Sequence, residues 1–243
     1  MDAGPGIVEE FSGVTMVREA YGQVYPARNT GLQAAPGKVI AFTDADCVVS
    51  SGWLSCFHDA ILVNGAFIVL GSIRFPSPKS EQLHLIEAYR NGYIDYVIEK
   101  NIRGHLHGYT KNMAMCAGIC DRVGPISEFP VPGDTEIIHQ CLRLLPETRL
   151  ASRADMWMNH LEIVNTRILF RKLVLYGAYD FHLDMPACDE SHHCRKSGAE
   201  SYPVRKHAYS LHQRFYLRYE AFLCNSCCAV YTVEEWMERR ARF

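Results

Sequence analysis

The sequence lacks several features that would identify a class of protein at once. It contains no run of about 18 apolar residues, so no segment is predicted to span a membrane as a helix. The most apolar stretch, residues 60–70, is interrupted by Asn64 and Gly65. The N-terminus does not show the charged, apolar and small-residue order of a signal peptide. These absences predict a soluble, cytoplasmic protein.

The chain also lacks a strong charge of either sign. Lys and Arg number 25 against 27 Asp and Glu, for a formal net charge of −2, which gives no electrostatic reason to expect a nucleic-acid partner. The ten cysteines are scattered along 243 residues, a pattern that fits reduced thiols better than a disulfide scaffold. The 48% hydrophobic content is that of a globular protein, either one large domain or a domain with an extension.

The chain is organised around a short apolar run, Val39 to Phe42, which ends at Thr43-Asp44-Ala45-Asp46. Because Pro36-Gly37 precedes the run and acidic residues follow it, the pattern predicts a buried strand. Open α/β sheets bind ligands at the carboxyl ends of their strands. Asp44 and Asp46 would lie there, where they can hold a divalent cation and, through it, a diphosphate. The alternative is a polar turn after a strand.

The surroundings of this run resemble the family 2 glycosyltransferases. The matching pieces are Ala27-Arg28-Asn29-Thr30-Gly31, Ala35-Pro36-Gly37, the apolar run, Asp44-Ala45-Asp46 and Trp53-Leu54. The resemblance implies an α/β fold of the GT-A type, a Rossmann-like mixed sheet flanked by helices. It also implies a nucleoside diphosphate sugar as donor. Arg28, Asn29, Asp44 and Asp46 would bind the donor, and the two aspartates would also hold Mg²⁺ or Mn²⁺.

A second match to the family lies downstream. Residues 111–115 correspond to a family strand, and residues 133–137 to a family helix start whose aspartate is the general base. The resemblance implies that Asp134 deprotonates the acceptor hydroxyl in an inverting transfer. By its own spacing, Asp134 is also well placed to be the N-cap of the helix that begins there.

The acceptor side is implied by neighbours of these matches. Lys111, Asn112 and Glu136 are expected to bind the acceptor. Two residues depart from the family pattern: Gly133 stands where the family usually has Glu, and Lys111 stands where it usually has Gly. The lysine brings a cation to the acceptor region, which can pair with a charged acceptor.

His160 is the third expected piece of the site. Many GT-A enzymes place a histidine after the base helix, where it helps to hold the metal or the diphosphate. A histidine ligand favours Mn²⁺ over Mg²⁺. The alternatives from the residues alone are a half-buried loop histidine at 160, an exposed helix-end arginine at 28 and a helix cap at Asn29.

Local patterns predict the order of helices and strands along the chain. The expected elements are a strand at 14–17, a turn at 25–26, a helix at 29–35, a strand at 39–42, a helix from 53 capped by Ser50 or Ser51, a strand at 66–71, a long helix at 81–99 and a basic amphipathic helix at 161–176. The last of these can lie on a membrane surface, although a packed helix is the alternative.

The two ends of the chain carry less family signal. No motif of the family's first two strands precedes residue 26, so we expect a fold that is incomplete at its N-terminus. Residues 1–180 are predicted to form the glycosyltransferase domain, and residues 181–243 a C-terminal helical extension of unknown role. The extension contains residues that allow a zinc site as an alternative to buried thiols: Cys188, His192, His193, Cys194, Cys224, Cys227 and Cys228.

The function implied by the resemblance is inverting sugar transfer to a hydroxyl-bearing saccharide or a lipid-linked acceptor. We expect a role in the synthesis of cell-surface polysaccharide or glycolipid, with peripheral membrane contact. The first alternative is a non-catalytic remnant that serves as a scaffold or interaction module. A second is metal-dependent phosphoryl transfer with Asp44 as nucleophile, which the context from Arg28 to Leu54 does not support.

Overall fold

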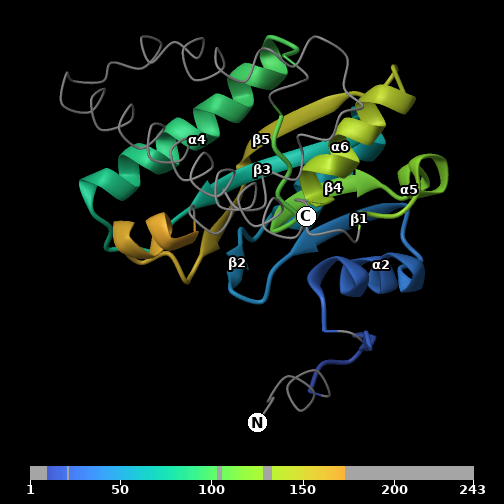
Figure 1. The fold of residues 1–243 in the computed structure, drawn as a ribbon, viewed down its shortest axis with the longest axis horizontal. Helices are drawn as coiled ribbons and strands as arrows, with labels where there is room; N and C mark the ends of the chain where they lie inside the picture. Colours follow the sequence, from blue (N-terminus) through green and yellow to red (C-terminus); the bar gives the residue numbers. More distant parts are fainter. Residues whose placement is uncertain (1–9, 21, 103–105, 128–132, 173–243) are drawn as a thin grey trace, which may run out of the picture.

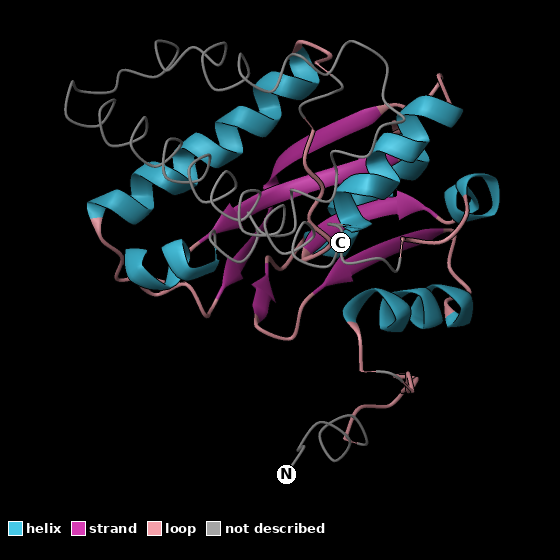
Figure 2. Ribbon diagram, viewed as in Figure 1, coloured by secondary structure: helices cyan, strands magenta, loops and turns pink. Residues whose placement is uncertain are grey.

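The computed structural model describes residues 10–20, 22–102, 106–127 and 133–172. Its strands are β1 (Val39–Thr43), β2 (Cys47–Val49), β3 (Ile68–Arg74), β4 (Asn112–Cys116) and β5 (Leu150–His160). Its helices are α2 (Val24–Ala34), α3 (Trp53–His58), the π-helix η1 (Asp59–Val63), α4 (Glu81–Glu99), α5 (Gly118–Val123) and α6 (Gly133–Leu144). Helices flank a single five-stranded sheet (Figures 1 and 2), so the prediction of an α/β fold of the GT-A type is confirmed.

The sheet is mixed, with the strand order β1-β4-β3-β5-β2. β4 runs antiparallel to both β1 and β3, β3 runs parallel to β5, and β2 runs antiparallel to β5. Consequently β1, β3 and β5 share one direction. Their carboxyl ends meet the starts of β4 and β2 at the same edge of the sheet, and that edge is where ligands of such sheets bind.

Alternate residues of the strands face two separate cores. Ile40, Leu70 and Met113 point into the core that the second half of α4, α5 and α6 share, whereas Val69 and Ala114 point into the core of α3 and η1. This alternation follows from the two-residue period of a strand. β1 is only half-buried, because it stands at the end of the strand order of the described sheet.

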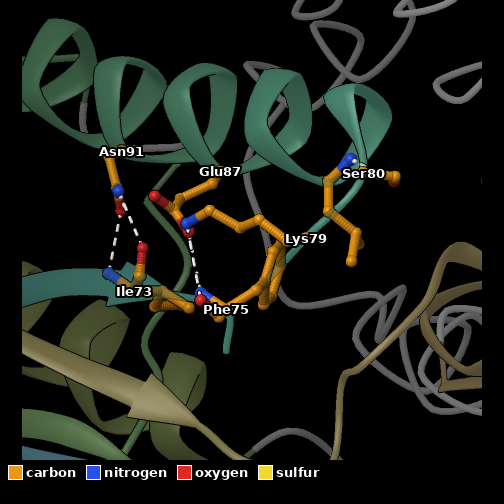
Figure 3. A network of polar contacts seen from close by, with 7 residues as sticks. Ile73, Phe75, Lys79, Ser80, Glu87 and Asn91 are labelled. Atoms are coloured by element: carbon orange, nitrogen blue, oxygen red, sulfur yellow. Dashed lines mark hydrogen bonds and ion pairs between the residues drawn. The ribbon is translucent and has the colours of Figure 1, made fainter. Parts of the chain in front are cut away.

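The long helix α4 has the predicted bounds, Glu81 to Glu99, and is tied to β3 by side chains (Figure 3). The Asn91 amide accepts from the Ile73 N–H and donates to the Ile73 carbonyl, both at 2.9 Å. Glu87 accepts from the Phe75 N–H at 2.7 Å and from Lys79 at 2.5 Å. These bonds hold the helix against the carboxyl end of β3, where the strand leaves the sheet.

Four local predictions in the first 60 residues were wrong. Residues 14–17 form no strand, and the helix predicted at 29–35 begins at Val24. The pattern predicts a turn at Pro26, but this proline lies in the first turn of α2, where a helix needs no N–H from it. Neither Ser50 nor Ser51 caps α3, because Gly52 precedes that helix and the buried Ser50 hydroxyl donates to the Asp155 carbonyl at 3.2 Å.

The C-terminal predictions are tested only in part. Residues 166–172 are helical, as predicted for 161–176, and residues 173–176 lie outside the described part of the chain. The extension at 181–243, with its possible zinc ligands, also lies outside it. No helix among the described residues is both long and apolar enough to cross a membrane.

Candidate active site

The predicted site residues come together because of the strand directions. Asp44 and Asp46 follow the carboxyl end of β1, and His160 is the last residue of β5. Lys111 precedes β4, and Asn112 is its first residue. Since β4 runs opposite to β1 and β5, these residues from distant parts of the sequence occupy one edge of the sheet.

Arg28 and Asp44 form an ion pair on this edge. The Arg28 Nη2 atom lies 2.9 Å from Asp44 Oδ1, and the two side chains are 19% and 37% exposed. Arg28 is therefore half-buried rather than the exposed helix-end arginine that the residues alone allowed. The pair connects α2 to the acidic turn after β1 and leaves a cation on the donor side of the predicted site.

Asp46 and His160 form a second pair. His160 Nδ1 lies 3.4 Å from Asp46 Oδ2, and β2–β5 pairing brings Cys47 opposite His160. His160 is only 2% exposed and ends a strand, so it is not a half-buried loop histidine. Burial, reinforced by the nearby Lys111, lowers the pKa of His160 to about 4, so the ring is neutral near pH 7. Its Nδ1 atom is buried and has no hydrogen-bond partner among the described residues.

The three predicted metal ligands are not gathered into one group. Among the described residues, no three His, Cys, Asp or Glu side chains are arranged to hold a metal ion. Asp44 pairs with Arg28, whereas Asp46 and His160 face each other, and the predicted role of Asp44 as a metal ligand stays a prediction. A buried neutral imidazole nitrogen without a partner beside a carboxylate suits a divalent cation, since both atoms are metal ligands and buried polar atoms are rarely left unpaired.

Asp134 lies in the first turn of α6 and is not its N-cap, because the helix already includes Gly133. Its Oδ2 accepts from the Thr110 N–H at 3.2 Å, and its Oδ1 from the Thr135 N–H at 3.1 Å. The Tyr25 hydroxyl donates to the same Oδ1 atom at 3.3 Å. Three donors from three segments therefore fix the orientation of this half-buried carboxylate.

Asn112 is a buried residue at the ligand edge of the sheet, and its predicted contact with an acceptor stays a prediction. Its side chain is fully buried, its Oδ1 accepts from Trp53 Nε1 at 2.7 Å, and its Nδ2 donates to the Ser72 and Met156 carbonyls at 2.8 Å each. Gly71 leaves room for this amide, because a Cβ at that position would lie 2.3 Å from Asn112 Nδ2. Asn112 holds the edge of the sheet together from within.

Asn29 also has a different place from the predicted cap. It lies inside α2, is 5% exposed, and exchanges two hydrogen bonds with the Ile126 backbone, at 2.8 and 2.9 Å. These two bonds anchor α2 to the segment after α5, and the predicted contact of Asn29 with the donor stays a prediction. Asn29 thus positions Arg28, its neighbour in α2.

The remaining predicted acceptor residues lie near the base. Glu136 follows Thr135 in α6 and is half-buried. Its Oε1 atom accepts a hydrogen bond from Gln140 Nε2 at 3.1 Å. Burial and Arg90 lower the pKa of Lys111 to about 8, against the attraction of Asp44 and Asp134, which lie within its electrostatic reach. The predicted contact of Lys111 with the acceptor stays a prediction.

Sequence reasoning missed Tyr25 because it placed the helix start too late. Once α2 begins at Val24, Tyr25 and Arg28 stand three residues apart and share one face of the helix. The Arg28 guanidinium carbon lies 5.4 Å from the centroid of the Tyr25 ring. Pro26 could have indicated the earlier helix start, because proline is tolerated in the first turn of a helix.

The mixed sheet, with an acidic turn and a histidine at its ligand edge, defines an α/β domain of the GT-A type. The model of the family described as glycosyl transferase family 2 matches residues 1–120. A curated relative, glycosyltransferase AglE of Haloferax volcanii, is 27% identical over 109 residues, 45% of this chain. The aligned stretch spans about a third of that relative, 35% of its length. Residues 1–120 of this chain thus belong to glycosyl transferase family 2.

Proposed function

We propose that this protein transfers a sugar from a nucleoside diphosphate sugar to a hydroxyl acceptor with inversion at the anomeric carbon. The observation that carries the proposal is the pair of Asp46 and His160, in which a buried, partnerless imidazole nitrogen faces a carboxylate at 3.4 Å. A cation held by these two atoms would satisfy the imidazole nitrogen, and a cation there suits a diphosphate. The family match and the relative AglE support glycosyl transfer as the general reaction.

Asp46 and His160 would hold Mn²⁺, or less readily Mg²⁺, with the remaining ligands coming from the diphosphate and water. The metal would supply Lewis-acid stabilisation of the charge that develops on the leaving nucleotide. Arg28 would add a positive charge on the same side, with Asp44 orienting its guanidinium group at 2.9 Å. Desolvation of this edge by the bound donor would strengthen these interactions.

Asp134 would be the general base. The acceptor oxygen attacks the anomeric carbon and forms the new glycosidic bond, while its proton passes to an Asp134 oxygen. The bond between the anomeric carbon and the diphosphate oxygen breaks, and its electron pair leaves with the nucleotide. The hydrogen bonds from Thr110 and Thr135 would keep the carboxylate aimed at the acceptor hydroxyl.

The proposed acceptor is a hydroxyl-bearing saccharide or lipid-linked molecule, in the synthesis of cell-surface polysaccharide or glycolipid. Lys111 lies within electrostatic reach of Asp134, so an anionic group on the acceptor would find a cation beside the base. Glu136, on the first turn of α6, would face the same molecule. A peripheral membrane contact is proposed with the lipid-linked acceptor.

Calorimetric titration of the full chain with UDP and then GDP, with and without Mn²⁺, tests the donor site. We expect Mn²⁺-dependent binding of one nucleotide by the wild type. Asp46→Ala should lower that affinity by about 100-fold, on the order of 2.7 kcal/mol. Asp121→Ala removes the same charge at an exposed position of α5 and is the matched control. A folded wild type that binds neither nucleotide would contradict the proposal and favour a non-catalytic remnant.

A further inference from the structure

We infer that Tyr25 is a positioning residue for the base: its hydroxyl group orients Asp134 toward the acceptor, while its ring supports Arg28 on the donor side. The inference rests on the proposed function and adds to it a residue that no part of the family pattern supplied. It joins the two halves of the site through one side chain.

The contacts of the Tyr25 hydroxyl group carry the first half of this inference. The hydroxyl donates to Asp134 Oδ1 at 3.3 Å. This bond connects the first turn of α2 directly to the carboxylate of the base. Burial, and then the charge of Asp134, raise the pKa of Tyr25 to about 12, so the hydroxyl keeps its proton throughout the range in which enzymes of this kind are assayed.

The space for the ring depends on Gly133. A Cβ atom built on that glycine would lie 3.1 Å from Tyr25 Cδ1 and 2.7 Å from the Ser127 carbonyl oxygen. Any larger residue at 133 would therefore displace the Tyr25 ring or the backbone beside it. The absence of a side chain at 133 lets the phenol approach the base from α2.

The other half of the inference is the stacking of Arg28. Its guanidinium carbon lies 5.4 Å from the Tyr25 centroid, within cation–π range, while its Nη2 atom reaches Asp44. Tyr25 and Arg28 share one helical face, so α2 carries a continuous path from Asp134 through Tyr25 and Arg28 to Asp44. When a donor binds to Arg28, the carboxylate of Asp134 would thus already be oriented.

The test is Tyr25→Phe in the full chain, because phenylalanine keeps the ring against Gly133 and under Arg28 and removes only the hydroxyl. We expect kcat to fall by about tenfold, with the Mn²⁺-dependent nucleotide affinity unchanged. The acid limb of the rate–pH profile should move to higher pH by about 0.5–1 unit, because a carboxylate that loses a donor takes up a proton more readily. Lys111 and Arg28 are the charged neighbours from other segments, and both remain.

The reaction followed would be the release of UDP from UDP-glucose or of GDP from GDP-mannose, whichever nucleotide the titration selects, with water in place of the acceptor. Tyr109→Phe is the matched control, because its hydroxyl donates to the Gly71 carbonyl at 2.7 Å, away from the base. It should lower the melting temperature without moving the acid limb. A second measurement uses the Asp134→Asn background, where Tyr25→Phe should cause no further loss if Tyr25 acts through Asp134.

The outcomes separate this inference from the proposed function. Nucleotide binding with an unmoved acid limb and unchanged kcat in Tyr25→Phe would overturn the role of Tyr25 and leave the proposed function standing. An additive loss in the Asp134→Asn background would likewise show a merely structural tyrosine. Absence of Mn²⁺-dependent nucleotide binding in the folded wild type would overturn both.

Discussion

Two buried polar side chains at the same edge of the sheet differ in one respect. Asn112, at the start of β4, is closed to solvent and uses its amide in three hydrogen bonds. His160, at the end of β5, is 2% exposed, yet its Nδ1 atom has no hydrogen-bond partner in the part of the chain that the structure describes. Burial of a polar atom without a hydrogen bond costs free energy, so it persists where a ligand can satisfy that atom. The first residue thus holds the edge together, and the second is available to a ligand.

The largest effect should follow from removing the satisfied amide. Asn112→Leu removes the acceptor of the Trp53 Nε1–H and the amide that donates to the Ser72 and Met156 carbonyls. We expect the free energy of unfolding to fall by about 3–5 kcal/mol, measured by urea denaturation. Asn64→Leu, at an exposed position after η1, should change it by less than about 0.5 kcal/mol. Equal losses of stability in Asn112→Leu and Asn64→Leu would contradict the structural role of the Asn112 amide.

In contrast to Asn112→Leu, His160→Leu should weaken nucleotide binding and leave stability almost unchanged. Because Nδ1 makes no hydrogen bond, the free energy of unfolding should change by less than about 1 kcal/mol. The affinity for nucleotide in Mn²⁺ should fall by about 100-fold. His139→Leu is the matched control, since its Nε2 atom lies 2.9 Å from the Leu106 carbonyl, and it should lower stability without weakening nucleotide binding. The reverse pattern in the two variants would contradict the proposal.

Asn29 belongs with Asn112 in this comparison, although sequence reasoning placed it on the donor. Asn29→Ala removes both bonds to the Ile126 backbone. We expect the free energy of unfolding, measured by thermal or chemical denaturation, to fall by about 1–3 kcal/mol. Nucleotide affinity should fall only to the extent that α2 shifts and displaces Arg28. Thr30→Ala, which removes one local bond to the Pro26 carbonyl at 3.0 Å, should cost less. A large loss of nucleotide affinity in Asn29→Ala, with an unchanged free energy of unfolding, would indicate that Asn29 binds the donor directly.

The smallest expected effect is a pH dependence of the metal-free protein. The pKa of His160 is lowered by burial to about 4, from 6.5 when unfolded, so the folded state resists protonation. Stability from this residue is therefore complete above pH 6.5 and is lost as pH falls toward 4. We expect the free energy of unfolding to drop by about 1–2 kcal/mol between pH 7 and pH 5, and this drop to be absent in His160→Leu. If the free energy of unfolding still drops between pH 7 and pH 5 in His160→Leu, another titratable group causes the drop.

Much of the domain could be predicted from local patterns. The strand from Val39, the helix from Glu81 to Glu99 and the apolar face of α6 follow from periodicity and stop signals, which act within a few residues. The first helix was predicted five residues late, because Pro26 reads as a turn when its position in the helix is unknown. The family itself was also readable, because its residues cluster around Asp44 and Asp46, and the match to residues 1–120 confirms it.

The sequence by itself determined the family, the strand that leads into the acidic turn, and the identity of the carboxylates and the histidine. Only the tertiary structure decided which of them meet. Asp44 and Asp46 are two residues apart, yet one pairs with Arg28 of α2 and the other faces His160 of β5. Asn112 and Asn29 look like ligands in a sequence, but hydrogen bonds to segments 40 to 97 residues away use their amides. Strand order and helix packing set these partners, and neither is encoded within a local window.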